Sequence, residues 1–175
     1  GNIDNGSNTI TTTGTITATI EPSSVASLTT LTGTNTYTIT IEGTDASAAT
    51  ASQLTTISNA TTVAVDASAV SGLAADNLSN IETLLIAGDD TTLFTADSFS
   101  LLEAIAVSDS TLDVSELNDA IDLANTLTGG ELAVTAFSLI SGATINGGDE
   151  SAFATLITNG ENGQLLVTDP VSYTH

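Results

Sequence analysis

The chain has 175 residues and a formal net charge of −21, because its 21 Asp and Glu residues are accompanied by no Lys or Arg. Without these cations it has no side chains for nucleic-acid phosphates, no arginine for bidentate capture of an anionic substrate, and no lysine for a P-loop or a Schiff base. The absence of Cys excludes disulfides, thiolate nucleophiles and sulfur-ligated metals. Every carboxylate therefore requires water, a backbone N–H group or a cation from solution.

The composition nevertheless predicts a folded chain, because 41% of the residues are apolar and disordered chains combine high charge with low hydrophobicity. We expect residues 1–13 to form a flexible or donated N-terminal segment. Residues 14–175 are predicted to be a single repeat domain of about six strand–helix units, with a soft boundary near residue 62. The start of the sequence indicates that a signal sequence has been removed or lies upstream. No apolar run reaches the length of a membrane span, so we expect no membrane insertion.

Threonine is concentrated in the first 62 residues, where it alternates with apolar residues at 15–20 and again at 37–41. This period of two predicts half-buried strands. The threonine arrays at 9–19 and 34–40 allow two interpretations: a hydroxyl-and-methyl surface of the ice-binding kind, or ordinary strands with one wet face, which we favour. An antiparallel, sandwich-like arrangement of this first third also stays open at this stage.

Further short apolar runs at 63–65, 84–86, 105–107, 132–134 and 165–167 predict later strands. Successive runs begin between 21 and 33 residues apart, which indicates a degenerate internal repeat. We therefore expect a β-rich α/β solenoid, in which stacked short strands form a largely parallel sheet and short helices cover the other face.

Between these runs lie short segments with helical spacing, each carrying a single apolar stripe. The stripes are Val25/Leu28/Leu31, Leu54/Ile57, Leu78/Ile81, Phe99/Leu102, Leu117/Ala120/Ile121/Ala124 and Phe153/Leu156/Ile157. Start signals are Pro22, Thr50 before Gln53, Asp113 before Glu116, and Asp149 before Glu150. The expected stop signals are Gly33, Asn59, Gly129 and Gly160.

The segment from Leu78 to Asp89 places Leu78, Ile81, Leu84 and Ile86 in a pattern that resembles the leucine-rich repeat, and the segment from Leu102 to Ser110 is a shortened relative. As a whole, the Lys-free units rich in Thr, Ser, Ala and Asp resemble repeat regions of large secreted bacterial surface proteins, including S-layer proteins and RTX-type adhesins. The resemblance implies an extracellular or cell-surface location.

Aspartates recur just beyond the predicted strands: Asp45, Asp66, Asp89, Asp90, Asp109 and Asp169. Stacked strands would bring equivalent positions to within about 4.8 Å, and Ca²⁺ prefers several oxygen ligands. We hypothesise that Asp89, Asp90, Asp109 and Asp113 contribute to one or more Ca²⁺ sites. The alternative is that these aspartates cap turns and helices through backbone N–H groups.

The sequence does not predict an enzyme, because its one histidine, His175, is the last residue and no nucleophile–base set is present. We expect a structural module of a bacterial surface layer, adhesin or filament that associates head to tail with other copies of itself, stabilised by calcium. Binding of an extracellular glycan or surface, or of ice, is the alternative function.

Overall fold

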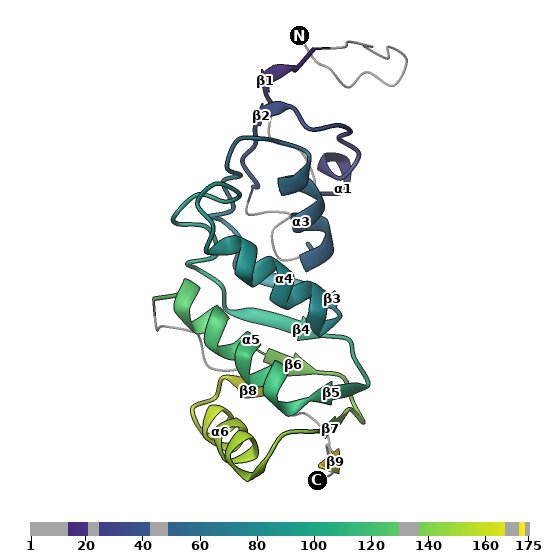
Figure 1. Cartoon of the computed structure of the whole chain (residues 1–175), viewed down its shortest axis with the longest axis vertical. Coiled ribbons are helices and arrows are strands. Elements are labelled where there is room, and N and C mark those ends of the chain that lie inside the picture. The colour runs from purple at the N-terminus through teal and green to yellow at the C-terminus, as the bar shows by residue number, and fades with distance from the viewer. Residues whose placement is uncertain (1–13, 21–24, 43–48, 130–136, 167–171, 174–175) are drawn as a thin grey trace.

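The computed structural model describes residues 14–20, 25–42, 49–129, 137–166 and 172–173 (Figure 1). Within them the chain is mixed α/β, with short strands and five helices. The strands are β1 (Thr17–Thr19), β2 (Thr36–Thr38), β3 (Gly72–Asp76), β4 (Ala104–Val107), β5 (Thr111–Asp113), β6 (Phe137–Leu139), β7 (Thr144–Asn146), β8 (Leu165–Leu166) and β9 (Ser172–Tyr173). The helices are α1 (Val25–Leu28), α3 (Ala51–Asn59), α4 (Leu78–Gly88), α5 (Val114–Leu127) and α6 (Glu150–Glu161).

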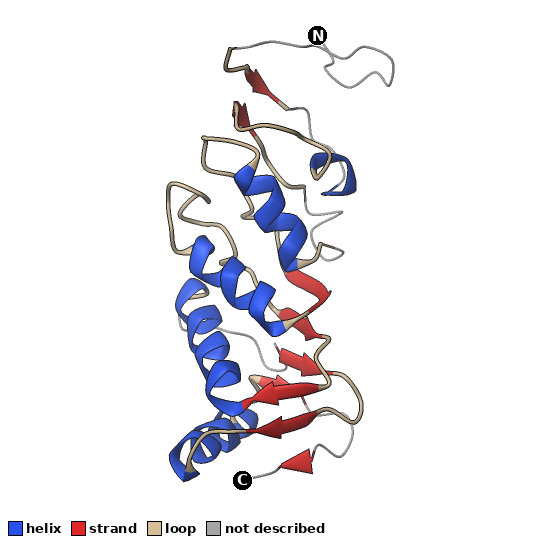
Figure 2. Ribbon diagram, turned by 45° about the vertical axis from the view of Figure 1, so that its right-hand side comes forward, coloured by secondary structure: helices blue, strands red, loops and turns tan. Residues whose placement is uncertain are grey.

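All strand pairs in the described residues are parallel, and they form three small sheets instead of the single sheet expected. The sheets have the orders β1-β2, β3-β4-β6-β8 and β5-β7-β9. Because β1 and β2 are parallel, the antiparallel alternative for the first third is wrong for its described strands. Figure 2 shows α3, α4, α5 and α6 following one another along one side of the molecule and the strands that come after α3 along the other. Each helix contacts the next, from α1 to α6.

The helices form where an apolar stripe coincides with a capping residue. Thr50 begins α3 with a full capping box, in which its hydroxyl accepts from the Gln53 N–H while the Gln53 side chain accepts from the Thr50 N–H. Asp113 and Asp149 are the N-caps of α5 and α6, as the sequence predicted. The α4 N-cap is Asn77, which the sequence analysis missed.

The core is one continuous cluster of apolar side chains, mostly aliphatic, between the helices and the strands. Its only aromatic pair is Phe94 and Phe99, whose ring centroids are 5.0 Å apart in an edge-on arrangement within the described core. Phe99 has a φ of 63°, unusual for a residue with a side chain, and its ring closes on Gly88, where even a Cβ would lie 2.9 Å from the ring. Because Gly88 has no side chain, α4 can end directly against the Phe99 ring.

Hydroxyl side chains take the place of backbone partners where strand pairing is irregular. The Thr61 hydroxyl accepts from the Tyr37 N–H at 2.9 Å and donates to the Tyr37 carbonyl at 2.7 Å. In the same way the Ser98 hydroxyl accepts from the Ala67 N–H and donates to the Val65 carbonyl. Both hydroxyls are buried, so they satisfy main-chain groups that water does not reach.

The strand predicted at 84–86 is wrong, because these residues lie inside α4. Leu78, Ile81, Leu84 and Leu85 are all buried on one face of that helix, so the spacing that resembled a leucine-rich repeat is a helical stripe here. The strand of this unit is β3 instead, whose small residues Gly72, Ala74 and Ala75 gave no strand signal. The stripe Phe99/Leu102 is also not a helix; it lies in turns before β4.

Two of the expected helix stops are wrong as well. Asn59 and Gly160 are both helical, and the left-handed residue after α6 is Gly163, with a φ of 77°. Gly33 and Gly129 do have positive φ values, as predicted.

The strands predicted near 15–20, 37–41 and 105–107 are confirmed. The strand predicted at 165–167 is confirmed over Leu165–Leu166, and the one at 63–65 is reduced to an isolated bridge at Val65. The strand at 132–134, Pro22 and the segment 1–13 lie outside the described residues.

Candidate functional site

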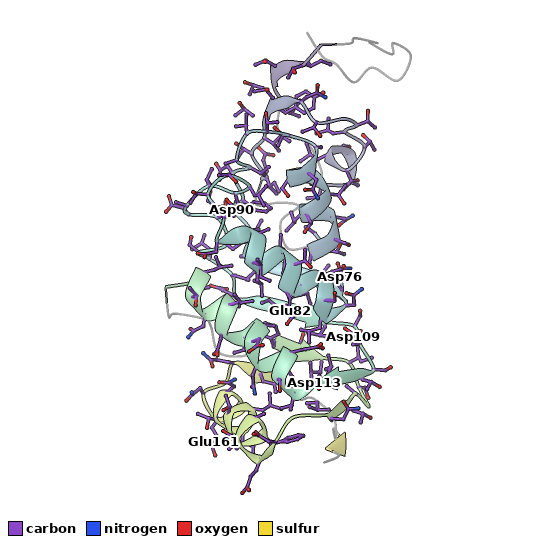
Figure 3. All side chains as sticks on the ribbon, in the orientation of Figure 1. Asp76, Glu82, Asp90, Asp109, Asp113 and Glu161 are labelled. Atoms are coloured by element: carbon purple, nitrogen blue, oxygen red, sulfur yellow. The ribbon has the colours of Figure 1, made fainter. Side chains whose placement is uncertain are left out.

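Aspartates gather at the edge of the molecule where the helices begin. Figure 3 shows Asp76, Asp109 and Asp113 along this edge, close to the starts of α4 and α5. The first turn of a helix carries unpaired N–H groups and the positive end of the helix dipole. In a chain with no Lys or Arg, these helix starts provide the positive potential that lysine and arginine side chains provide elsewhere.

Two of these aspartates reach the helix of the preceding strand–helix unit. Asp76, at the end of β3, accepts a hydrogen bond from the Ser52 N–H in the first turn of α3 at 2.8 Å. Asp109, just after β4, accepts from the Leu78 N–H at the start of α4 at 2.6 Å. Each carboxylate thereby joins a strand end to the helix before it, a bond that a residue capping its own helix does not make.

The pKa of Asp76 reflects this environment. Partial burial by itself would raise the pKa of the carboxyl, but hydrogen bonds from the Asn80 side chain and from the Ser52 and Asn77 N–H groups outweigh burial. The net result is a pKa below the ordinary value of 3.8. Asp76 is therefore ionised at neutral pH and held by three donors.

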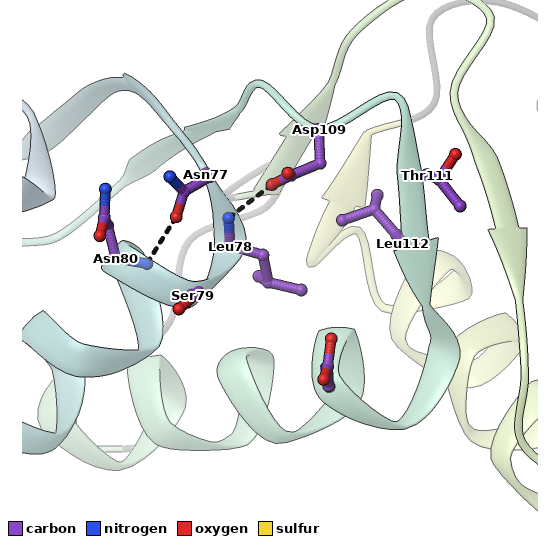
Figure 4. A pocket seen from close by; sticks show the side chains of 8 residues that line it. Asn77, Leu78, Ser79, Asn80, Asp109, Thr111 and Leu112 are labelled. Atoms are coloured by element: carbon purple, nitrogen blue, oxygen red, sulfur yellow. Dashed lines mark hydrogen bonds between the residues drawn. The ribbon is translucent and has the colours of Figure 1, made fainter.

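An open groove of about 360 Å³ lies beside the start of α4 (Figure 4). It is lined by Asn77, Leu78, Ser79, Asn80, Asp109, Thr111, Leu112 and Glu116. The lining combines two carboxylates, two hydroxyls and two amides, a set suited to a hydrated cation or a polyol but offering no paired nucleophile and base. Asp109 already accepts the Leu78 N–H inside this groove, as the dashed line in Figure 4 shows.

The four predicted calcium ligands are not brought together. Asp109 and Asp113 lie near the start of α4 and α5, whereas Asp89 and Asp90 follow the last residue of α4. A helix of 11 residues is about 16 Å long, so α4 separates the two pairs. No group of three or more Asp, Glu or His side chains in the described part of the chain is arranged to hold a metal ion.

Three of the four make hydrogen bonds that explain their positions without a metal. Asp113 accepts from the Ser115 N–H at 2.8 Å, and Asp89 is the C-cap of α4. Asp90 accepts from both the N–H and the hydroxyl of Thr92, which lowers the pKa of its carboxyl. The capping alternative accounts for Asp90, Asp109 and Asp113, and calcium binding stays a prediction.

A second acidic group lies between α4 and α5, and the sequence analysis missed it. Burial raises the pKa of Glu82 on α4, and the nearby charges of Glu116 and Asp119 on α5 raise it further. The chain has no Lys or Arg to relieve this repulsion. The sequence did not indicate this acidic group, because a strand was predicted at 84–86 and Glu82 was therefore not assigned to the helix that packs on α5.

Comparison with family models, curated proteins and solved structures finds no match for this chain. Among the described helices, none combines the length and the apolar character needed to cross a membrane.

Proposed function

We propose that the chain is an extracellular structural module of a bacterial surface layer, adhesin or filament, built as a solenoid and joined end to end with other copies. The observation that carries this proposal is the pairing of the outermost strands. Among the described strands, β1 pairs only with β2, β8 only with β6, and β9 only with β7. Both ends thus present strand edges of the same parallel polarity, to which a further parallel strand adds without reversal.

The way each unit is buried supports the solenoid part of the proposal. Helices α3, α4 and α5 each pack between two neighbouring helices, and within each of the three sheets the strands pair in chain order. Contacts are thus mainly between adjacent units, the arrangement in which stability comes from neighbour-to-neighbour interfaces. Such an architecture supplies length and repeated surfaces, which a structural module uses.

Sedimentation velocity of the chain in millimolar CaCl₂ and in EDTA tests the proposal. We expect large species that grow with protein concentration, because every added copy recreates the same open end. Growth in CaCl₂ alone would support the calcium part, since divalent cations relieve the repulsion between chains of charge −21. A compact monomer at all concentrations in both solutions would contradict the proposed function.

The threonine register favours a second candidate, a module that binds ice or another extended surface. Thr17 lies beside Thr36, Thr19 lies beside Thr38, and the Thr36 and Thr62 hydroxyl oxygens are 3.2 Å apart. Parallel strands give such an array regular spacings of about 4.8 Å across and about 6.6 Å along the strands. The test is thermal hysteresis, with Thr83→Lys as the control because Thr83 is exposed on α4, away from the threonine array. Hysteresis that is lost in Thr38→Lys but kept in Thr83→Lys would support ice binding. A wild type without hysteresis would contradict it.

A further inference from the structure

The outer side of α6 is the place where the row of helices ends. Asn159 on α6 donates to the Asn118 side chain on α5 at 3.1 Å, and Asn118 donates to the Ala152 carbonyl at 2.9 Å, so this face of α6 is turned toward α5. Ile157 is two residues from Asn159, which corresponds to about 200° around the helix. Ile157 therefore points away from α5, and its side chain is 61% exposed.

The opposite end of the molecule leaves its apolar side chains half covered. Ile16 and Ile20, which flank β1, and Leu31, which follows α1, pack against the core but are only partly buried. In the interior units the equivalent aliphatic side chains are fully buried, as at Ile105 and Ile81. Further apolar contact at this end would therefore remove more surface from water.

Charge distinguishes the two ends. The described residues 14–20 and 25–42 contain one acidic residue, Glu42, and Glu21 follows Ile20 in the sequence, whereas α6 has Asp149 at its N-cap and carries Glu150 and Glu161 at its two ends. Two C-terminal ends would therefore bring more like charges together than a C-terminal end that faces the less acidic β1 end. The charge pattern thus opposes tail-to-tail contact and permits head-to-tail contact.

The free edge of β1 is identified by its hydrogen bonds. The Thr36 N–H donates to the Ile16 carbonyl, and the Ile20 N–H donates to the Thr38 carbonyl. In a parallel ladder alternate residues bond to opposite sides, so the N–H and C=O groups of Thr17 and Thr19 face away from β2. Within the described residues they are available to another strand of the same direction.

We infer that the β1 edge and the half-covered residues Ile16, Ile20 and Leu31 of one copy dock on the outer face of α6, around Ile157, and on the adjoining β8 and β9 edges of a second copy. This inference rests on the proposed function and specifies which surfaces form the contact between successive copies. The contact is heterologous, so each copy keeps one free end and the assembly continues as a filament.

Two variants disable one end each. Ile157→Glu places a charge on the outer face of α6, and Thr19→Pro removes an outward N–H from an edge strand, where proline is tolerated. Ile86→Glu is the matched control for the first, because Ile86 on α4 is also 61% exposed but lies within the row of helices. Thr19→Ala is the control for loss of the threonine side chain.

The experiment is sedimentation velocity at physiological ionic strength, in millimolar CaCl₂ and in EDTA, with circular dichroism to confirm folding. We expect polymers from the wild type and both controls, and monomers from each end variant alone. An equimolar mixture of Ile157→Glu and Thr19→Pro should give dimers, because each variant keeps the end that the other lacks. Polymers from both end variants would show that the proposed contact is wrong, while the proposed function would still stand. Wild-type assembly that stops at a dimer would also show that the proposed contact is wrong. A wild type that stays monomeric in both CaCl₂ and EDTA would overturn both proposals.

Discussion

The carboxylate of Asp109 accepts a hydrogen bond from the backbone N–H of Leu78 at 2.6 Å, so an aspartate that follows β4 caps the helix of the unit before it. The same relationship joins Asp76 to Ser52 one unit earlier. These bonds connect neighbouring units at the edge of the molecule where the helices begin. They also place negative charge at helix starts, where the backbone favours it.

Removing this inter-unit cap should destabilise the chain. We expect Asp109→Ala to lower the free energy of unfolding by about 1 kcal/mol, the usual cost of losing a carboxylate partner at a helix start. Urea denaturation followed by circular dichroism measures the change. Asp97→Ala removes the same charge from an exposed turn and should change stability much less; equal losses in the two variants would argue against the cap.

The lowered pKa of Asp76 predicts a pH dependence. A carboxyl whose folded-state pKa lies below its unfolded value of 3.8 contributes stability above that value, and the contribution is lost as the pH falls through the folded-state pKa. Asp76→Asn should therefore lower stability at neutral pH and flatten the fall in stability below pH 3.8. Urea midpoints measured across the acid range check this prediction. If the midpoint of Asp76→Asn falls with decreasing pH as steeply as that of the wild type, the prediction is wrong.

Glu82 should behave in the opposite sense. Burial and the charges of Glu116 and Asp119 raise its folded-state pKa above 4.5, so its favourable contribution is complete below pH 4.5 and is lost as the pH rises through the folded-state value. Glu82→Gln should raise stability at neutral pH by less than about 1 kcal/mol, because solvent screens the group. The gain should shrink in high salt. Glu103→Gln, at an exposed position before β4, is the control; an equal gain there would point to net charge alone.

Gly147 should tolerate no side chain. Its φ is 74°, and a Cβ there would collide with the carboxylate of Asp113, the N-cap of α5. Gly147→Ala should cost more than about 1 kcal/mol, because backbone strain and the collision add. Gly129→Ala separates the two effects: Gly129 has a φ of 69°, but no atom of the described residues lies within 4 Å of the added carbon. Equal costs would show that the collision contributes nothing.

Local capping and the longer helices could be predicted from the sequence, because a capping residue and a stripe of fixed period are local signals. Thr50, Asp113 and Asp149 each begin the helix that their sequence context indicates. The unit containing α4 could not be assigned correctly, because Leu84 and Leu85 suit a buried strand and a helix equally well. Only packing between α3 and α5 decides for the helix.

In the candidate site, the capping role of the aspartates could be predicted from local sequence, but the helices that they cap could not. That Asp109 and Asp113 would cap backbone groups followed from residue type and position. That Asp109 would serve the preceding helix, or that Asp89 and Asp90 would lie at the far end of α4, depended on how units stack. Asp76 was missed because β3 consists of small residues without a strand pattern.

The buried hydroxyls of Thr61 and Ser98 carry an implication for how such chains change over evolutionary time. Each of these single side chains completes the main-chain bonding of the neighbouring segment, at Tyr37 and at Val65 and Ala67. The connection around such a residue does not have to supply a full strand, so it is free to gain or lose residues while the ladder stays closed. Insertions and deletions should therefore accumulate beside these hydroxyls, which accounts for a period that drifts along the sequence while the architecture is kept.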